Sequence, residues 1–517
     1  METVIIKIAQ VVVAFALLIV LHEGGHFVCA KLFKIRVEKF YLFFDFPIVS
    51  NSPLFSLFAY RNKKFAFIRY IKFIKIEDES NDDDKKKDPE YTMDVFSLAK
   101  FENGKWSFCN WERGLSTKDP EADCETYHTE YGAGWLPLGG YVNITGMIDE
   151  STQELSSEPK PWEFRTKPAW QRLIVMLGGI IVNFITAFVI YIAVLFTWGE
   201  SYIKPTDMTH GLKFSEAAIA DGFRDGDIIV KTDDKEIKAW NVNVLRDISN
   251  ADEVTILRDG QEEVLNMPAK MNMLDMIQSN PPYAEPLLPF CIDSIMPNSP
   301  AEQIGLKKGD VINAINGIEV DNFNEFAHQL SVLGEPLTEN STAADSLKLR
   351  TITLLVNNTD SLKAVLTPEF TLGFQNKAPE YKITNEEFSL LQSIPAGCSY
   401  GWEKLGSYVN DLKYLFTAQG AKSVSGVVGI TNIFPDVWDW QKFWLLTALL
   451  SIALGVMNVL PIPALDGGHA VFAIYEIITR RKPSDKVLAT AQYIGVFLLI
   501  ALMIFATWND ITRLLGM

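Results

Sequence analysis

The sequence predicts a multi-span α-helical membrane protein with about four transmembrane helices and a large α+β region between the second and third of them. Two observations carry this prediction. Four apolar segments are each long enough to cross a bilayer, and residues 200–440 are instead acidic and rich in strand and turn signals. At 517 residues the chain is also too long for a single hydrophobic core.

The four apolar segments are expected to be helices because each is a nearly uninterrupted apolar run. They run from about Val4 to Phe33, Leu173 to Phe196, Phe443 to Leu460, and Tyr493 to Trp508. The first carries ionisable residues in its second half, and such residues are rarely kept in a membrane span without a role. A functional site is therefore expected there.

The overall charge and the cysteines exclude several classes of protein. A net charge of −17 argues against a nucleic-acid partner, since phosphate binding needs a basic surface. The five cysteines show no Cys-x-x-Cys spacing, which argues against a disulfide framework or a cysteine-ligated metal. The N-terminal apolar run continues into HEGGHFVCAKLF without a small-residue cleavage site, so a cleaved signal peptide is not expected.

The connections between the spans suggest an orientation. The short third loop contains Arg480, Arg481, Lys482 and Lys486, and basic short loops favour the cytoplasm. Four spans then place both termini and residues 200–440 outside. Residues 35–130 form a polar cytoplasmic insertion, whose charge run at 79–90 is interpreted as solvated or disordered.

Residues 200–440 contain an internal repeat. ADGFRDGDIIVKTDDKEI at 220–237 aligns with QIGLKKGDVINAINGIEV at 303–320. The second copy follows a Ser-Pro-Ala helix start and resembles bacterial PDZ domains, which bind extended peptides by strand addition. The first copy lacks a clear Ser-Pro-Ala start, and the alternative that both copies only pack or restrict access stays open.

HEGGH at the end of the first span is the motif that carries chemistry. His22 and His26 are four residues apart, so a helix presents both imidazoles on one face to one metal ion. Glu23 can then serve as general base toward a water molecule. Gly24 and Gly25 suggest that a substrate or another backbone approaches this helix closely.

A catalytic zinc site needs a third protein ligand. The segment MNVLPIPALDGGH, at 457–469, contains two candidates. Pro461 and Pro463 must end the third span, and the backbone groups that they free at membrane depth are tolerated when they line a polar cavity. Either Asp466 or His469 can supply the ligand, and spacing alone does not separate them. Asn458 lies about two helical turns earlier and can hydrogen-bond to a substrate backbone.

These two motifs together resemble the site-2 protease family, and the four spans with a PDZ pair resemble its bacterial RseP-like branch. The resemblance implies a zinc ion (Zn²⁺) held by the two histidines and Asp466, with Glu23 as the base. It also implies that Asn458 and Pro461 hold an unwound substrate.

Two further segments carry the resemblance. GWLPLGGYVNITGM at 134–147, with Gly139 and Gly140, resembles a membrane-associated β-hairpin that pairs with an extended substrate. KPAWQRLIVMLGGIIVNF at 167–184 resembles the start of the second span. The resemblance is weakest over residues 35–130.

The resemblance implies a metalloendopeptidase that cuts single-span membrane proteins, such as anti-sigma factors or remnant signal peptides, after an earlier cleavage. It implies a multi-pass protein of the inner membrane, with the PDZ pair outside and the active site open to the cytoplasm. Three other classes are weighed against it: a non-catalytic PDZ scaffold, a metal transporter, and a membrane metalloprotease of another class.

The resulting division of the chain has ten parts. They are 1–34 (first span with HEGGH), 35–130 (insertion), 131–170 (hairpin and approach to the second span), 171–199 (second span), 200–283 and 284–375 (the two PDZ-like domains), 376–440 (amphipathic linker), 441–466 (third span with the aspartate), 467–490 (cytoplasmic loop) and 491–517 (fourth span).

Overall fold

The computed structural model describes residues 2–45, 54–75, 91–116, 126–147, 159–233, 235–267, 273–336 and 342–515. They divide into two compact units, Met1–Trp198 with Phe388–Met517 and Gly199–Glu387. The charge run at 79–90 lies outside the described residues. Cys29, Cys109, Cys291 and Cys398, the cysteines within these ranges, are free thiols.

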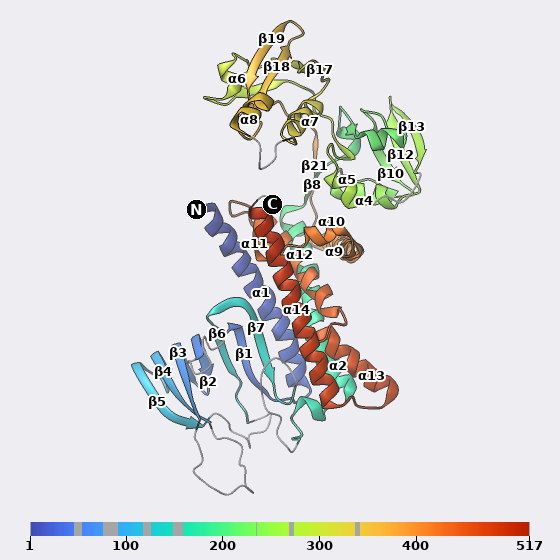
Figure 1. Cartoon of the computed structure of the whole chain (residues 1–517). Helices are drawn as coiled ribbons and strands as arrows, with labels where there is room; N and C mark the ends of the chain where they lie inside the picture. Colours follow the sequence, from blue (N-terminus) through green and yellow to red (C-terminus); the bar gives the residue numbers. More distant parts are fainter. Residues whose placement is uncertain are drawn as a thin grey trace. The chain divides into compact units, whose positions relative to one another are not determined.

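Four helices in the first unit are long and apolar enough to cross a membrane, as predicted. They are α1 (Glu2–Leu32), α2 (Ala169–Trp198), α12 (Trp440–Val459) and α14 (Asp485–Leu514) (Figure 1). α14 begins eight residues before the predicted span because Ser484 caps it, accepting a hydrogen bond from the Val487 amide. Polar residues thus extend the helix beyond its apolar run.

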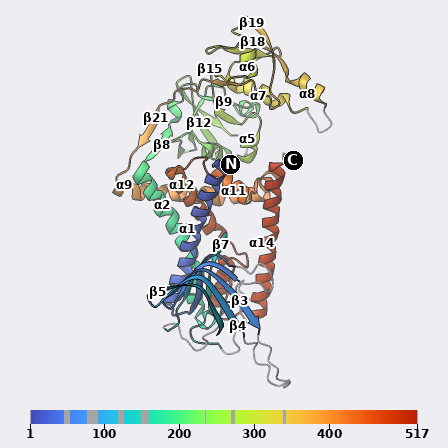
Figure 2. The same cartoon turned by 90° about the vertical axis from the view of Figure 1, so that its left-hand side faces the viewer.

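The spans α2 and α12 share a buried core, with Ala187, Ile190, Tyr191 and Val194 facing Ala448, Ile452 and Val456. The α14 helix stands beside the other spans (Figure 2). Near its C-terminal end, Asp510 Oδ2 accepts hydrogen bonds from the amides of Gly426 and Val428, 3.0 and 3.2 Å away, at α11 (Val427–Ile433).

The predicted extent of the third span, 441–466, is wrong at its end. The α12 helix stops at Val459, and Asp466 is the first residue of a new helix, α13 (Asp466–Thr479). The predicted loop at 467–490 is therefore helical in its first half. Pro461 and Pro463 stop α12 as expected, but the chain resumes helical structure once past them.

The predicted insertion at 35–130 has defined structure that the sequence analysis did not predict, because most of its described part forms strands. A seven-stranded sheet has the order β5-β4-β3-β2-β6-β1-β7. Its strands are β1 (Val37–Phe44), β2 (Leu54–Arg61), β3 (Lys64–Lys75), β4 (Tyr91–Glu102), β5 (Lys105–Ser116), β6 (Glu130–Gly134) and β7 (Leu136–Ile144). Alternating segments such as KFAFIRYIKFIK are strand patterns that the neighbouring charge run obscured.

The predicted hairpin at 134–147 is not a pair of neighbouring strands. β1 lies between β6 and β7, parallel to β6 and antiparallel to β7. A strand from the preceding segment is inserted into the hairpin, so local turn signals could not reveal the pairing. β7 ends the sheet, and among the described residues no strand pairs with its outer edge.

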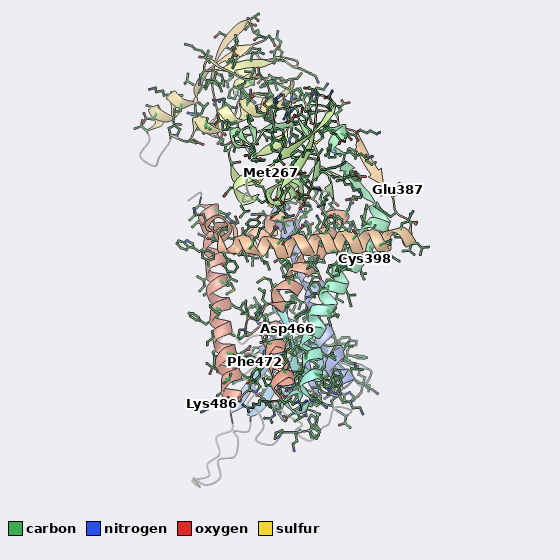
Figure 3. The ribbon with its side chains drawn as sticks, turned by 90° about the vertical axis from the view of Figure 1, so that its right-hand side faces the viewer. Met267, Glu387, Cys398, Asp466, Phe472 and Lys486 are labelled. Carbon is green, nitrogen blue, oxygen red and sulfur yellow. The ribbon has the colours of Figure 1, made fainter. Side chains whose placement is uncertain are left out.

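The predicted linker at 376–440 contains defined structure. It holds β21 (Ile383–Glu386), α9 (Leu390–Asp411), the 3₁₀ helix η3 (Leu412–Phe416), α10 (Ala418–Ser423) and α11. Figure 3 shows α9, marked by Cys398, lying across the direction of the spans. A further 3₁₀ helix, η1 (Phe164–Thr166), precedes α2.

The second unit contains two copies of one topology. One copy has the sheet β11-β10-β12-β13 and the other β17-β16-β18-β19, and each adds a two-stranded sheet, β9–β14 or β15–β20. The strands are β8 (Glu200–Ile203), β9 (Leu212–Phe214), β10 (Ile228–Thr232), β11 (Lys235–Glu236), β12 (Glu253–Arg258), β13 (Gln261–Asn266), β14 (Ala284–Pro286), β15 (Ile292–Ile295), β16 (Ile312–Ile315), β17 (Ile318–Glu319), β18 (Thr351–Val356), β19 (Asp360–Val365) and β20 (Phe374–Asn376). The helices are η2 (Pro205–Asp207), α3 (Glu216–Ala220), α4 (Val242–Asn250), α5 (Met273–Gln278), α6 (Pro300–Gln303), α7 (Phe323–Leu333) and α8 (Ala343–Arg350).

The two copies share the helix start that the sequence revealed clearly in only one. Ser299 caps α6, and Ser215 caps α3 in the same way, each accepting a hydrogen bond from the amide three residues on. The predicted boundary between 283 and 284 is a few residues early, because β14 pairs with β9 of the first copy. β21 pairs with β8 and joins the two ends of the unit.

Candidate metal centre

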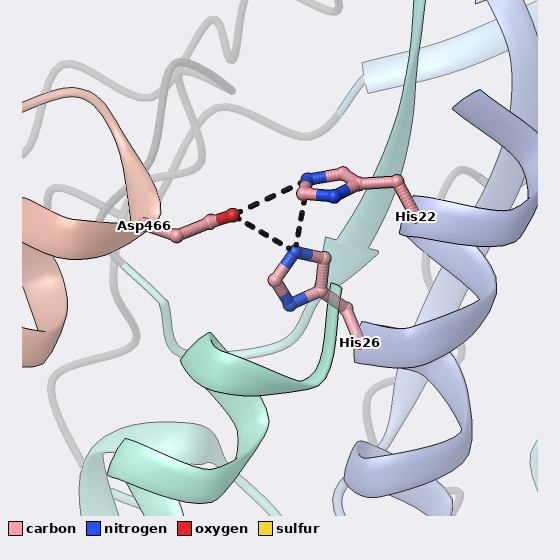
Figure 4. A group of neighbouring side chains, drawn as sticks. All are labelled: His22, His26 and Asp466. Carbon is pink, nitrogen blue, oxygen red and sulfur yellow. Dashed lines mark hydrogen bonds and ion pairs between the residues drawn. The ribbon is translucent and has the colours of Figure 1, made fainter. Parts of the chain in front are cut away.

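The two histidines of HEGGH meet at one point, as their spacing predicts. His22 and His26 lie one helical turn apart on α1, and both are buried. Their Nε2 atoms are 3.3 Å apart (Figure 4). Two nitrogen lone pairs therefore face the same small volume.

A carboxylate completes the group. Asp466 Oδ2 lies 3.2 Å from His22 Nε2 and 3.3 Å from His26 Nε2. The turn before α13 places it there, and Ala464 in that turn has a positive φ of 81°. The following glycines allow the turn to close, since a Cβ on Gly467 would lie 2.3 Å from the Leu460 carbonyl oxygen.

The arrangement fits a tetrahedral zinc ion. Zinc–nitrogen and zinc–oxygen distances of 2.0–2.2 Å put neighbouring ligand atoms about 3.3–3.4 Å apart, and the three observed separations are 3.2, 3.3 and 3.3 Å. Asp466 Oδ2 is also buried without a hydrogen-bond donor. Three protein ligands leave a fourth position for substrate or water, as in catalytic zinc sites.

Hydrogen bonds from the second helix orient both imidazoles. His26 Nδ1 lies 2.8 Å from the Val175 carbonyl oxygen of α2, so this nitrogen carries the proton and Nε2 keeps its lone pair. Asn183, also on α2, lies with its side-chain amide 3.0 Å from His22 Nδ1.

The sequence analysis missed Asn183. Its side chain is fully buried, and its Oδ1 has no hydrogen-bond partner. Rotating the amide by half a turn places Oδ1 where it accepts a hydrogen bond from His22 Nδ1–H, which leaves His22 Nε2 free for a metal. An asparagine inside LIVMLGGIIVNFITAF was the signal, because polar residues in spans mark functional sites.

Close packing of α1 against α2 supports this geometry. A Cβ on Gly25 would lie 2.4 Å from the Gly178 carbonyl oxygen, and one on Gly179 would lie 2.4 Å from His26 Nε2. The prediction that another backbone approaches the Gly-Gly pair is thus confirmed at Gly25, whereas Gly24 faces open space.

The other predicted site residues lie at different distances from the three ligand atoms. Glu23 receives a hydrogen bond from the Val142 backbone of β7. Asn458 Nδ2 is 3.4 Å from His22 Nε2. Pro461 lies in the exposed turn between α12 and α13.

The two glycines of the 134–147 segment lie in β7, where the strand approaches α1. A Cβ on Gly140 would lie 2.5 Å from Ile19 Cγ2 of that helix. One on Gly139 would lie 2.2 Å from the Phe44 ring of β1. These glycines thus let β7 lie against both neighbours, and they bring the strand to the helix that carries the histidines.

His469 does not join the cluster. It lines a cavity of about 60 Å³ together with Met147, Phe164 and Arg172. The metal-binding group found among the described residues is His22, His26 and Asp466. The geometry thus favours the carboxylate over the competing imidazole.

Two histidines in a membrane helix and a carboxylate at the start of the helix that follows another span, with a glutamate beside the first histidine, define the class of a membrane metallopeptidase. The model of peptidase family M50 matches residues 10–97 and 122–502. The chain therefore belongs to peptidase family M50, and it is a metalloprotease of the site-2 type.

Individual relatives agree with the family. The regulator of sigma E protease of Haemophilus influenzae is 26% identical over 415 residues, covering 75% of this chain and 88% of that protein. The zinc metalloprotease RasP of Shouchella clausii is 36% identical over 220 residues, covering 42% of this chain and 50% of the relative. A Campylobacter jejuni protein with a zinc-metalloprotease name is 33% identical over 240 residues, which are 44% of this chain and 61% of that relative.

Proposed function

We propose that the protein is a zinc-dependent intramembrane endopeptidase whose metal is held by His22 Nε2, His26 Nε2 and Asp466 Oδ2. The observation that carries the proposal is the meeting of these three atoms at separations of 3.2–3.3 Å, with Asp466 Oδ2 otherwise unpartnered. Zinc, when bound, supplies a Lewis acid that polarises a peptide carbonyl and activates water near neutral pH.

The chain's own residues account for the remaining steps. Glu23 follows His22 on α1, and the Val142 amide holds its carboxylate toward β7. It takes a proton from the attacking water and returns it to the leaving amine. Asn458, next to His22, donates its amide N–H groups toward the substrate carbonyl. Pro461 keeps the adjoining turn out of a helix, which leaves room for an extended chain.

The free edge of β7 is proposed to bind the substrate. A transmembrane helix hides its carbonyl groups in its own hydrogen bonds, so it must unwind before cleavage. β7 ends the seven-stranded sheet and reaches the Glu23 side chain, and Gly139 and Gly140 lie within it. Pairing with this edge replaces the hydrogen bonds lost on unwinding.

The proposed substrates are single-span membrane proteins. The Haemophilus influenzae relative is named regulator of sigma E protease, which supports anti-sigma factors as one substrate class. Remnant signal peptides are a second. The two copies in Gly199–Glu387 are proposed to be PDZ-like domains that admit only substrates already trimmed by an earlier protease. The basic third loop supports an inner-membrane location, with these domains outside and the active site open to the cytoplasm.

The test is cleavage of a tagged single-span substrate by purified full-length protein in bilayers. Glu23→Gln is expected to reduce cleavage by about a thousandfold or more while zinc stays bound, since the glutamate moves protons and is not a ligand. Glu2→Gln, at the exposed start of the same helix, is the matched control. Unchanged cleavage by Glu23→Gln would refute Glu23 as the base, whereas absence of cleavage by the wild type would favour a non-catalytic scaffold or transporter.

A further inference from the structure

The seven-stranded sheet carries a continuous aromatic row on one face. Strand register places six aromatic residues side by side across six strands, each paired with the next. The row is Phe40, Tyr131, Tyr60, Phe65, Phe101 and Trp106. Ring contacts of 6.3 Å between Phe65 and Trp106 and 5.2 Å between Phe101 and Trp106 confirm that these side chains share a face.

A second apolar row lies two residues further along each strand, on the same face. It consists of Leu42, Ala133, Phe58, Phe67, Ala99 and Phe108, again in register. Several of these large side chains are open to the surroundings: Tyr60 is 44% exposed, Phe67 50%, Trp106 55% and Phe108 70%. We call the two rows together the aromatic face.

An ion-pair cluster of Lys64, Lys100, Glu102 and Glu112 lies on the opposite face. Lys64 pairs with Glu102 at 2.8 Å, and Lys100 pairs with Glu102 at 2.6 Å and also with Glu112. Lys100 is only 7% exposed. A sheet in water normally buries its apolar side and exposes its charges. Here Lys100 is buried beneath its two carboxylates while the large aromatic rings are exposed, which resembles a β-structure that faces lipid.

The aromatic face is continuous with the outer surface of the first span. The Phe27 ring of α1 lies 5.5 Å from Phe40 and 5.9 Å from Tyr131, the first two residues of the row. Val28 and Leu32, next along α1, are 63% and 71% exposed, as expected of side chains that contact lipid. Figure 1 shows the sheet beside the same half of α1 that carries HEGGH.

We propose that the aromatic face of β1–β6 lies in the membrane interface and contacts lipid, which extends the lipid-facing surface of α1 onto the sheet. Tyrosine and tryptophan prefer the interface, where the ring is shielded and the polar end stays hydrated. Lys63 and Lys105, exposed at the β2–β3 and β4–β5 turns beside the row, can reach lipid phosphates. Because β7 belongs to the same sheet, this contact also holds the substrate-binding edge at membrane depth.

The test uses photo-crosslinking in full-length protein reconstituted into vesicles of phosphatidylethanolamine and phosphatidylglycerol. p-Benzoylphenylalanine is introduced singly at Phe108, on the aromatic face, and at Ser107, its exposed neighbour on the other face of β5. Val28 on α1 serves as the lipid-facing reference. Replacing one aromatic ring by another keeps the fold, and the readout needs neither zinc nor catalysis.

We expect lipid adducts at Phe108 to approach those at Val28 and to exceed those at Ser107 by on the order of tenfold, because acyl chains surround only the interfacial side chain. Adduct at Phe108 no greater than at Ser107, with Val28 labelled normally, would overturn the proposal. So would predominant crosslinks from Phe108 to protein, whether to a second copy of this chain or, in native membranes, to another polypeptide.

Discussion

Replacing Asn183 by leucine should weaken zinc binding without disturbing the fold of the spans. The side-chain amide lies 3.0 Å from His22 Nδ1 and is fully buried, so leucine of similar volume removes the partner of an imidazole N–H that water cannot reach. Loss of such a supporting hydrogen bond typically lowers metal affinity by about 10–100-fold, or about 1.4–2.7 kcal/mol.

The assay is competition for zinc between the detergent-solubilised full-length protein and a chromogenic chelator. Asn183→Asp keeps an acceptor for His22 Nδ1–H, so it should retain or raise the zinc affinity. If Asn183 had only a structural role, Asn183→Leu and Asn183→Asp would not differ in zinc affinity. Thr197→Ala is the matched control on α2, because its hydroxyl donates a hydrogen bond to the Ala193 carbonyl oxygen of its own helix. Wild-type zinc affinity in Asn183→Leu would refute the assignment of Asn183 as a positioning residue.

Two further predictions concern stability. Gly25→Ala should destabilise the protein by about 1–3 kcal/mol, since its Cβ would lie 2.4 Å from the Gly178 carbonyl oxygen. The Cβ of Gly24→Ala would meet nothing within 4 Å, so that variant should be neutral or stabilising in thermal unfolding. Equal effects of the two substitutions would argue against the α1–α2 contact. In the second unit, Lys213 Nζ lies 2.6 Å from Glu325 Oε1 and joins the two copies. Burial alone would raise the pKa of Glu325, but its hydrogen bonds, led by that from Lys213, lower it. A lowered carboxylate pKa stabilises the fold above the ordinary carboxyl range and ceases to do so as pH falls through the lowered pKa. The advantage of wild type over Lys213→Met, about 1 kcal/mol or less at pH 7, should therefore be lost as pH falls through the lowered pKa of Glu325. A difference that is unchanged at low pH would contradict this.

The residues that sequence reasoning identified best are those fixed by a single helix or a single apolar run. His22 and His26 share a face because four residues make slightly more than one helical turn, and each span is recognisable from its length and composition. Asp466 could not be separated from His469 by spacing, because the choice depends on how the turn after Val459 folds back before α13 begins. The path of that turn depends on how its prolines and glycines pack against neighbouring segments.

The features that were missed depend on contacts between distant segments. Asn183 acquires its role only because α2 packs against α1 at Gly25. The β6–β7 segment looks like a local hairpin, yet β1, about ninety residues earlier than β6, is inserted into it. The strands β2–β5 were obscured because a run of charges between them dominated the interpretation of the whole insertion. In each case the local pattern was present, but the partner was not adjacent in sequence.

The zinc content of three purified full-length proteins tests the central claim most directly. Wild type and His469→Ala should each carry stoichiometric zinc, because His469 lies in a separate cavity outside the ligand group. Asp466→Ala should lose it, since two imidazoles alone leave the tetrahedral site incomplete. Retention of zinc by Asp466→Ala together with its loss from His469→Ala would contradict the proposed metal centre.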